Sequence, residues 1–135
     1  MVARVQVKGL EPLMRAFITA GQDAPRFAMK ALHEEASEAF LLSQEVVPVE
    51  FGTLRASGKV HPPRFRGTSA EVDITYGGGA AHYAIYVHEL PPSRARHAPP
   101  TRWKYLAHPV KAYAEGMADR MTVRVLDMIH RRFAI

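Results

Sequence analysis

Apolar and polar positions divide the first half of the chain into a strand and two helices. Residues Ala3 to Lys8 alternate strictly, which predicts a short strand with one buried face. Residues Leu10 to Ile18 place apolar side chains at i, i+3, i+4, i+7 and i+8, the spacing of an amphipathic helix. Asp23 can cap a second helix, which runs to about Val46 and is stopped by Pro48.

The second half of the chain alternates again and then returns to helical spacing. Alternation predicts strands over 54–60 and 70–76, and the apolar, β-branched and aromatic residues of 82–88 predict another strand. Turns at Pro62–Pro63 and Gly77–Gly79 separate these strands. From about Tyr105, apolar side chains recur at helical spacing to Phe133, which predicts one long helix. The expected fold class is α+β. An antiparallel sheet of about four strands packs against a long N-terminal helical segment and a long C-terminal helix.

We expect a single domain over residues 1–135, interrupted by one extended loop at about 89–104. This loop is rich in proline and basic residues, namely Pro91, Pro92, Arg94, Arg96, Pro99, Pro100, Arg102 and Lys104. Proline cannot donate to a strand ladder, and unstructured loops longer than about 12–15 residues are uncommon in compact domains. The loop therefore indicates a docking arm, mobile in the isolated chain and fixed on a partner. The alternative is a solvated loop without a partner.

The only tryptophan, Trp103, lies at the end of this loop. Tryptophan often anchors protein interfaces, so Trp103 is a candidate contact residue. A core position, covering the last helix, is the alternative interpretation.

Composition narrows the class of protein further. The chain has 135 residues, a formal net charge of +5 and no cysteine. The absence of cysteine excludes disulfides, thiolate zinc sites and a cysteine nucleophile. The charge favours contact with polyanions or acidic protein surfaces. No apolar run approaches the roughly 20 residues of a membrane span, and the N-terminus lacks a signal-peptide pattern, so we expect a non-secreted protein without a membrane partner.

The histidines do not form a catalytic or metal-binding pattern. His33-Glu34-Glu35 begins like a zinc-protease motif, but Ser37 occupies the position of the second histidine, which favours a solvated helix face. On a strand, His82 and His88 would lie roughly 20 Å apart, too far to share a metal, and we expect them at the surface or an interface. A small ribonuclease that uses His82, His88 or His97 is an alternative function. The sequence shows no second catalytic residue at a defined spacing from these histidines.

Three other patterns have structural explanations. Gly77–Gly79 precedes a strand rather than a Lys-Ser/Thr helix start, so it predicts a turn and not a phosphate loop. Glu71 and Asp73 share a strand face that alternation assigns to solvent. Met117, Met121 and Met128 form a helical stripe typical of a core. We therefore expect no enzymatic activity, no metal and no cofactor.

Three segments in order resemble the tail-completion, or neck, family of long-tailed bacteriophages. Pro48 to Ser57 reads P-V-E-F-G-T-L-R-A-S and is similar to the family's P-V-D-T-G-x-L-R-x-S segment. Tyr83 to Glu89 resembles its Y-A-x-Y-V-E-x-G segment. Lys104 to Val110 is similar to the proline-containing stretch before its final helix. Glu50-Phe51 replaces Asp-Thr, and His88-Glu89-Leu90 replaces the glutamate-x-glycine.

The resemblance implies a structural virion protein at the head–tail junction. Such subunits form a ring, commonly a hexamer, which completes the upper end of the tail and helps join it to the head. Implied partners are copies of the chain, the neighbouring connector or head-completion protein, and the tail-terminator or tail-tube protein, with packaged DNA nearby. The implied location is the virion neck, after assembly in the host cytoplasm. Expected docking residues are Arg55, Tyr83, Tyr86, Glu89, Arg94, Arg96, Arg102 and Trp103.

A small basic nucleic-acid-binding protein is the alternative function. The net charge and the arginine-containing loop favour it. Single-strand binders, however, interleave aromatic and basic side chains on a strand face, and here only Tyr83 and Tyr86 are candidates.

Overall fold

The protein, as a computed structural model, is described over residues 1–8, 24–48, 52–66, 69–78, 81, 83–89 and 104–133. Its sheet is antiparallel and centred on β4 (Ser69–Thr75), with β1 (Val2–Val7) on one side. On the other side lie β2 (Lys59–Val60) and β3 (Arg64–Arg66), which pair with successive halves of β4. The α+β class and the strands predicted at the N-terminus and at 70–76 are confirmed.

A bulge separates β2 from β3. Val60 pairs with Ile74 and Arg64 pairs with Glu71, so three residues, His61 to Pro63, stand opposite two residues of β4. The extra residue resets the alternation of the edge strand. Val60 and Phe65 consequently pack against the core, whereas Arg64 joins the opposite face of the sheet.

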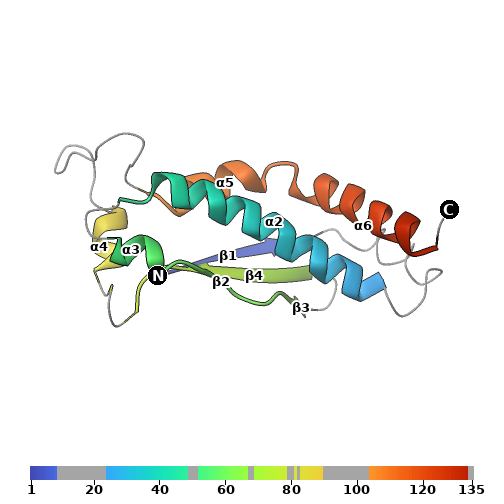
Figure 1. Ribbon diagram of the computed structural model, residues 1–135, viewed down its shortest axis with the longest axis horizontal. Helices are drawn as coiled ribbons and strands as arrows, with labels where there is room; N and C mark the ends of the chain where they lie inside the picture. The colour runs from blue at the N-terminus through green and yellow to red at the C-terminus, as the bar shows by residue number, and fades with distance from the viewer. Residues whose placement is uncertain are drawn as a thin grey trace.

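All three long helices lie on one face of the sheet (Figure 1). The helix α2 (Ala24–Val46) contacts β4 and β2, while α5 (Ala107–Ala114) contacts β1. The helix α6 (Met117–Phe133) continues from α5 along α2. Two short helices, α3 (Thr53–Ala56) and α4 (Ala84–Glu89), lie at the end of the molecule where α2 ends and α5 begins.

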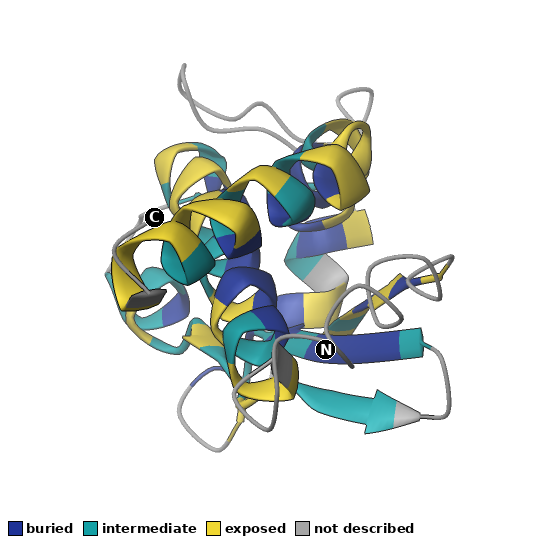
Figure 2. Ribbon diagram, turned by 90° about the vertical axis from the view of Figure 1, so that its right-hand side faces the viewer, coloured by how far each residue is buried: buried dark blue, intermediate teal, exposed yellow. Residues whose placement is uncertain are grey.

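The core lies between the sheet and this helical layer, where Figure 2 shows the buried faces of the elements. Small residues of α2, such as Ala28, Ala31 and Ala36, are fully buried and allow close packing on the strands. Met117 and Met121 are buried and Met128 packs against the core, so the predicted core role of this stripe is confirmed. The helix predicted over residues 10–18 lies outside the described residues.

The strand predicted over 54–60 is wrong for its first half, which forms α3. Gly52 adopts a left-handed conformation, with φ of 76°, and its carbonyl accepts the N–H of Ala56 to open one helical turn. Leu54 is buried from this turn. Pairing with β4 begins only at Lys59, because the backbone before it is occupied by helical hydrogen bonds.

The strand predicted over 82–88 is also wrong, because residues 84–89 form α4. Ala84 and His88 are buried and Val87 is half-buried, which is the i, i+3, i+4 spacing of a helix face, whereas Ile85 is exposed. The segment is rich in β-branched and aromatic residues, so propensity favoured a strand that tertiary packing overrides. The sheet keeps four strands within the described ranges because β3 supplies the fourth.

The single long helix predicted from Tyr105 is broken into α5 and α6. Glu115 is extended and Gly116 has a φ of 74°, so the chain turns between the two helices. Arg120 holds this turn, because its Nη1 donates to the carbonyl of Glu115 at 2.8 Å and its Nη2 donates to the carbonyl of Tyr113. The core stripe keeps its helical spacing across the break, which is why the sequence pattern did not reveal it.

Glu35 is buried, which corrects the prediction of a solvated face for His33-Glu34-Glu35. Its carboxylate accepts the Nε of Arg120 at 2.6 Å and the Nε of Arg124 at 2.9 Å. The Arg120 guanidinium also stacks over the ring of Tyr113, 4.1 Å from its centroid. This ion cluster fastens α6 to α2 and compensates the desolvation of the carboxylate.

Candidate docking site

The two ends of the predicted docking arm are joined to each other in the structure. We call the residues that join them, His88, Glu89 and Lys104, the base of the arm. The backbone N–H of Lys104 donates to the carbonyl of His88 at 2.8 Å, and the Lys104 ammonium pairs with the carboxylate of Glu89. Lys104 has a φ of 53°, a left-handed conformation that turns the chain into α5. The described residues on either side of 90–103, Glu89 and Lys104, therefore lie next to each other.

His88 is the centre of this base. It is buried within its own domain, which corrects its predicted place at the surface or an interface. Its Nε2 accepts the N–H of Ala107, the first residue of α5, at 3.2 Å. Nε2 must then be unprotonated, so the ring carries its hydrogen on Nδ1 and donates it to Glu89 at 3.0 Å. Burial lowers the pKa of His88, which favours this neutral form. His88 thus caps α5 in place of Leu106, whose side chain makes no cap hydrogen bond.

Glu89 stays ionised at this base. The hydrogen bond from Lys104, followed by that from His88, lowers the pKa of its carboxyl group. Glu89 is exposed and is one of the predicted docking residues. It joins the last turn of α4 to the start of the next described segment.

Three buried residues with hydroxyl groups, Tyr105, Ser43 and Tyr76, are hydrogen-bonded in sequence next to His88. We call them the hydroxyl chain. The hydroxyl of Tyr105 donates to the carbonyl of Ala84 at 2.7 Å, and its ring meets His88 and Tyr76 edge-on. Ser43 donates to the carbonyl of Tyr105 at 2.8 Å, so the hydroxyl of Tyr76 donates to Ser43 at 2.9 Å. Burial raises the pKa of both tyrosines, which keeps these donors protonated. The base is therefore fixed to α2 and to the end of β4.

Arg55 lies on α3, at the same end of the molecule. Its carbonyl accepts the side-chain amide of Gln44 at 3.1 Å, and the same amide donates to the hydroxyl of Tyr76 at 2.7 Å. The Arg55 side chain is half-buried, and its Nε has no hydrogen-bond acceptor among the described residues. Arg55 is thus linked to the hydroxyl chain through its backbone.

The other predicted docking residues are only partly described. Tyr83 is half-buried against the core and precedes α4, where its carbonyl accepts the N–H of Val87. Tyr86 lies in α4, and its side chain is outside the description. The remaining four, namely Arg94, Arg96, Arg102 and Trp103, lie outside the described residues.

Sequence reasoning missed the residues that build the base, above all His88, Lys104 and Tyr105. One signal was present, because Glu89 and Lys104 place opposite charges at the two ends of the proline-rich segment. The hydroxyl chain had no such signal, since Ser43 and Tyr76 are far apart in sequence.

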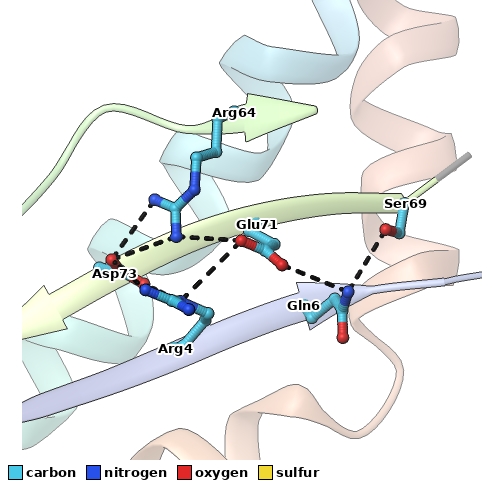
Figure 3. Close-up of polar contacts among 6 residues, drawn as sticks. All are labelled: Arg4, Gln6, Arg64, Ser69, Glu71 and Asp73. Carbon is cyan, nitrogen blue, oxygen red and sulfur yellow. Dashed lines mark hydrogen bonds and ion pairs between the residues drawn. The ribbon is translucent and has the colours of Figure 1, made fainter. Parts of the chain in front are cut away.

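A second polar cluster covers the face of the sheet opposite the helices (Figure 3). Arg4 donates to Asp73 at 2.9 Å, and Arg64 pairs with both Asp73 and Glu71. Gln6 bridges Glu71 and Ser69. Glu71 is 5% exposed, which corrects its predicted place on a solvated face, because the two arginines cover it. Arg4, the main cause, lowers the pKa of Asp73.

No group of three or more metal-ligating side chains occurs within the described ranges. None of the helices in the described part of the chain is long and apolar enough to cross a membrane.

No protein-family model, curated protein or solved structure matches this chain.

Proposed function

We propose that this protein is a structural subunit of the head–tail junction of a long-tailed bacteriophage. In this role it forms a ring with copies of itself, completes the upper end of the tail and helps attach the tail to the head. Residues 90–103 dock on a neighbouring subunit, held at their base by His88, Glu89 and Lys104. This function continues the resemblance in the three segments described above.

The closed base of residues 90–103 is the observation that carries the proposal. An arm that docks on a neighbour must transmit force to its own domain, and this arm is tied to α4, α5 and α2 through His88 and Tyr105. Because its two ends are already joined, ordering the arm on a partner closes no additional loop, which lowers the entropic cost of docking.

Gly52, Leu54 and Ser57, in the first of the three resembling segments, each have a structural role. Gly52 supplies the left-handed conformation that opens α3, and Leu54 is buried in the core. The hydroxyl of Ser57 donates to the carbonyl of Leu54 at 2.6 Å and accepts the N–H of Gly77 at 2.9 Å. This segment therefore connects α2 to the sheet and ties α3 to the end of β4, which supports the use of its residue pattern as a marker of the fold.

Deletion of the gene from the phage genome tests the function. The expected particles are filled heads and separate tails, visible by electron microscopy, with infectivity restored by the protein supplied from a plasmid. Intact infectious particles without the protein would refute the proposal.

A second experiment tests the arm itself. Complementation with Arg94→Glu/Arg96→Glu should fail to join heads to tails, while the matched surface variant Lys30→Glu/Lys111→Glu, which changes two exposed cations elsewhere, should complement. Equal complementation by both variants would contradict the role of the arm.

A further inference from the structure

The helix α6 presents a second apolar ridge to solvent. Met121 and Val125 face the core and are fully buried, whereas Val123 is 67% exposed and Leu126 is 57% exposed. Large apolar side chains at such exposure, three residues apart on one helix, lie on the same surface. Neither contributes to the core on which α6 depends.

The ridge follows the heptad spacing of a helix–helix seam. Asp119, Val123, Leu126 and His130 are separated by four, three and four residues, the spacing of successive a and d positions. The core residues Met121 and Val125 fall at positions on the opposite side of α6. The helix can therefore bury one face in its own domain and present the other to a second helix.

A hollow lies beside the ridge. It has a volume of about 320 Å³ and is lined by Asp119, Arg120, Val123 and Arg124. Two of its lining residues, Arg120 and Arg124, are fixed by hydrogen bonds to Glu35. The hollow is shallow and open to solvent, so it leaves the surface beside Val123 accessible to a second helix.

The charges along α6 select the partner. The first turn carries Asp119, and the last turn carries His130, Arg131 and Arg132. An antiparallel second copy of α6 places Asp119 of each helix against the basic last turn of the other, and it also aligns the helix dipoles favourably. A parallel copy would place the two basic ends together.

We propose that α6 is a self-association surface on which two copies of this chain pair antiparallel. About a two-fold axis between residues 124 and 125, Val123 meets Leu126 of the second copy, and Asp119 meets His130 of the second copy. The contact is isologous and closed, so it is distinct from the heterologous contact that a ring requires. It does not rest on the proposed function.

We expect the dimer to be weak, because each copy contributes only two large apolar side chains, Val123 and Leu126. Stable interfaces bury about 1,200–2,000 Å² in total, more than one short ridge supplies. The dimer is therefore expected to form as protein concentration rises, which sedimentation equilibrium on the full chain can follow. A protein that shows no association up to millimolar concentration would overturn the proposal.

One variant on α6 and one control variant on α2 test whether the dimer contact lies on α6. Leu126→Glu should raise the dimer dissociation constant by about tenfold or more, because it buries a charge opposite an apolar side chain. Leu41→Glu on α2 is the matched control, since Leu41 is 56% exposed, and it should leave the dissociation constant unchanged. Circular dichroism verifies that both variants are folded. Equal effects of the two substitutions would overturn the assignment.

Disulfide cross-linking determines whether the two copies of α6 are antiparallel. The chain has no native cysteine, so only the introduced cysteines can form a disulfide. An equimolar mixture of Asp119→Cys and His130→Cys proteins should form an inter-chain disulfide under mild oxidation. Each variant alone should not, because eleven residues of helix, about 16 Å, separate equivalent positions in the antiparallel pair. Efficient disulfides in the single variants, or none in the mixture, would overturn the antiparallel arrangement.

Discussion

The imidazole of His88 accepts the backbone N–H of Ala107 at 3.2 Å and so caps a helix that begins nineteen residues later. An acceptor is needed here because the first N–H groups of α5 have no partner within the helix. The same ring donates to Glu89, which pairs with Lys104. One neutral side chain therefore connects α4, α5 and both ends of residues 90–103.

Stability should fall as pH drops below about 6.5, in part through His88. Its pKa in the folded protein is lowered, so the unfolded chain binds the proton first and protonation favours unfolding. His88→Phe keeps an aromatic ring but removes the acceptor, which should cost about 1–3 kcal/mol at pH 7.5. The variant should also lose less stability than the wild type between pH 7 and pH 5, as measured by urea unfolding.

The control for this experiment is His33→Gln, since His33 is exposed on α2. This substitution should leave the stability at pH 7.5 close to that of the wild type. An unchanged pH dependence in His88→Phe would show that His88 does not require its neutral form.

Removal of the buried carboxylate of Glu35 should destabilise the protein strongly. Glu35→Ala leaves Arg120 and Arg124 facing each other without their shared anion, and breaking such a pair costs about 2–4 kcal/mol when the arginines are about one-third exposed. Glu34→Ala removes the outer partner of Arg124 at a half-exposed position and should cost less than about 1 kcal/mol. Chemical unfolding measures both, and similar losses for the two variants would contradict the assigned role of Glu35.

Gly58 should not tolerate a side chain. A Cβ at this position would lie 2.7 Å from Phe40 Cε2, 2.7 Å from Gln44 Nε2 and 2.8 Å from Tyr76 Cε1. Gly58→Ala must therefore displace these three side chains and should cost about 1–3 kcal/mol. Phe40→Leu removes one of the three contacts, so the cost of Gly58→Ala should be smaller in that background. Strictly additive losses would argue against the clash.

The acid limb of the stability curve should depend on Asp73. Arg4 and Arg64 lower its pKa, so its contribution is present above the ordinary carboxyl pKa of 3.8 and is lost as pH falls through the lower folded value. Asp73→Asn should therefore lose less stability than the wild type between pH 5 and pH 2. Asp127→Asn is the comparison: it breaks only an exposed pair with Arg131 on α6 and should change the stability at pH 7 by less than about 1 kcal/mol. Thermal unfolding across this range distinguishes the two.

The sequence predicted the parts of the fold whose period was unambiguous. Alternation at Val5 and Val7, and at Val72 and Ile74, located the two long strands, because one face of each is buried. The period of α2 was equally clear. The prediction for residues 84–89 was wrong. A six-residue segment rich in β-branched and aromatic residues has too few positions to distinguish a period of 3.6 from a period of 2.

The candidate site was less predictable because its residues come from distant segments. Glu89 was expected, yet the contacts that fix it depend on His88 and on the left-handed turn at Lys104. Glu35 and Glu71 were assigned to solvent because local patterning cannot show that arginines far along the chain cover them. Burial of a charge is decided by tertiary pairing, which periodicity does not encode.

The bulge at His61–Pro63 also bears on how this sheet avoids unwanted polymerisation. A regular edge strand is a template on which another chain can extend the sheet, and bulges and prolines are two means of preventing this. The β2–β3 edge has both, since Pro62 and Pro63 lack an N–H and the extra residue interrupts the ladder. The β1 strand contains neither a proline nor a bulge in its pairing with β4. Fibrillar or domain-swapped forms of this protein should therefore grow from β1, and a proline introduced at Arg4 should suppress them.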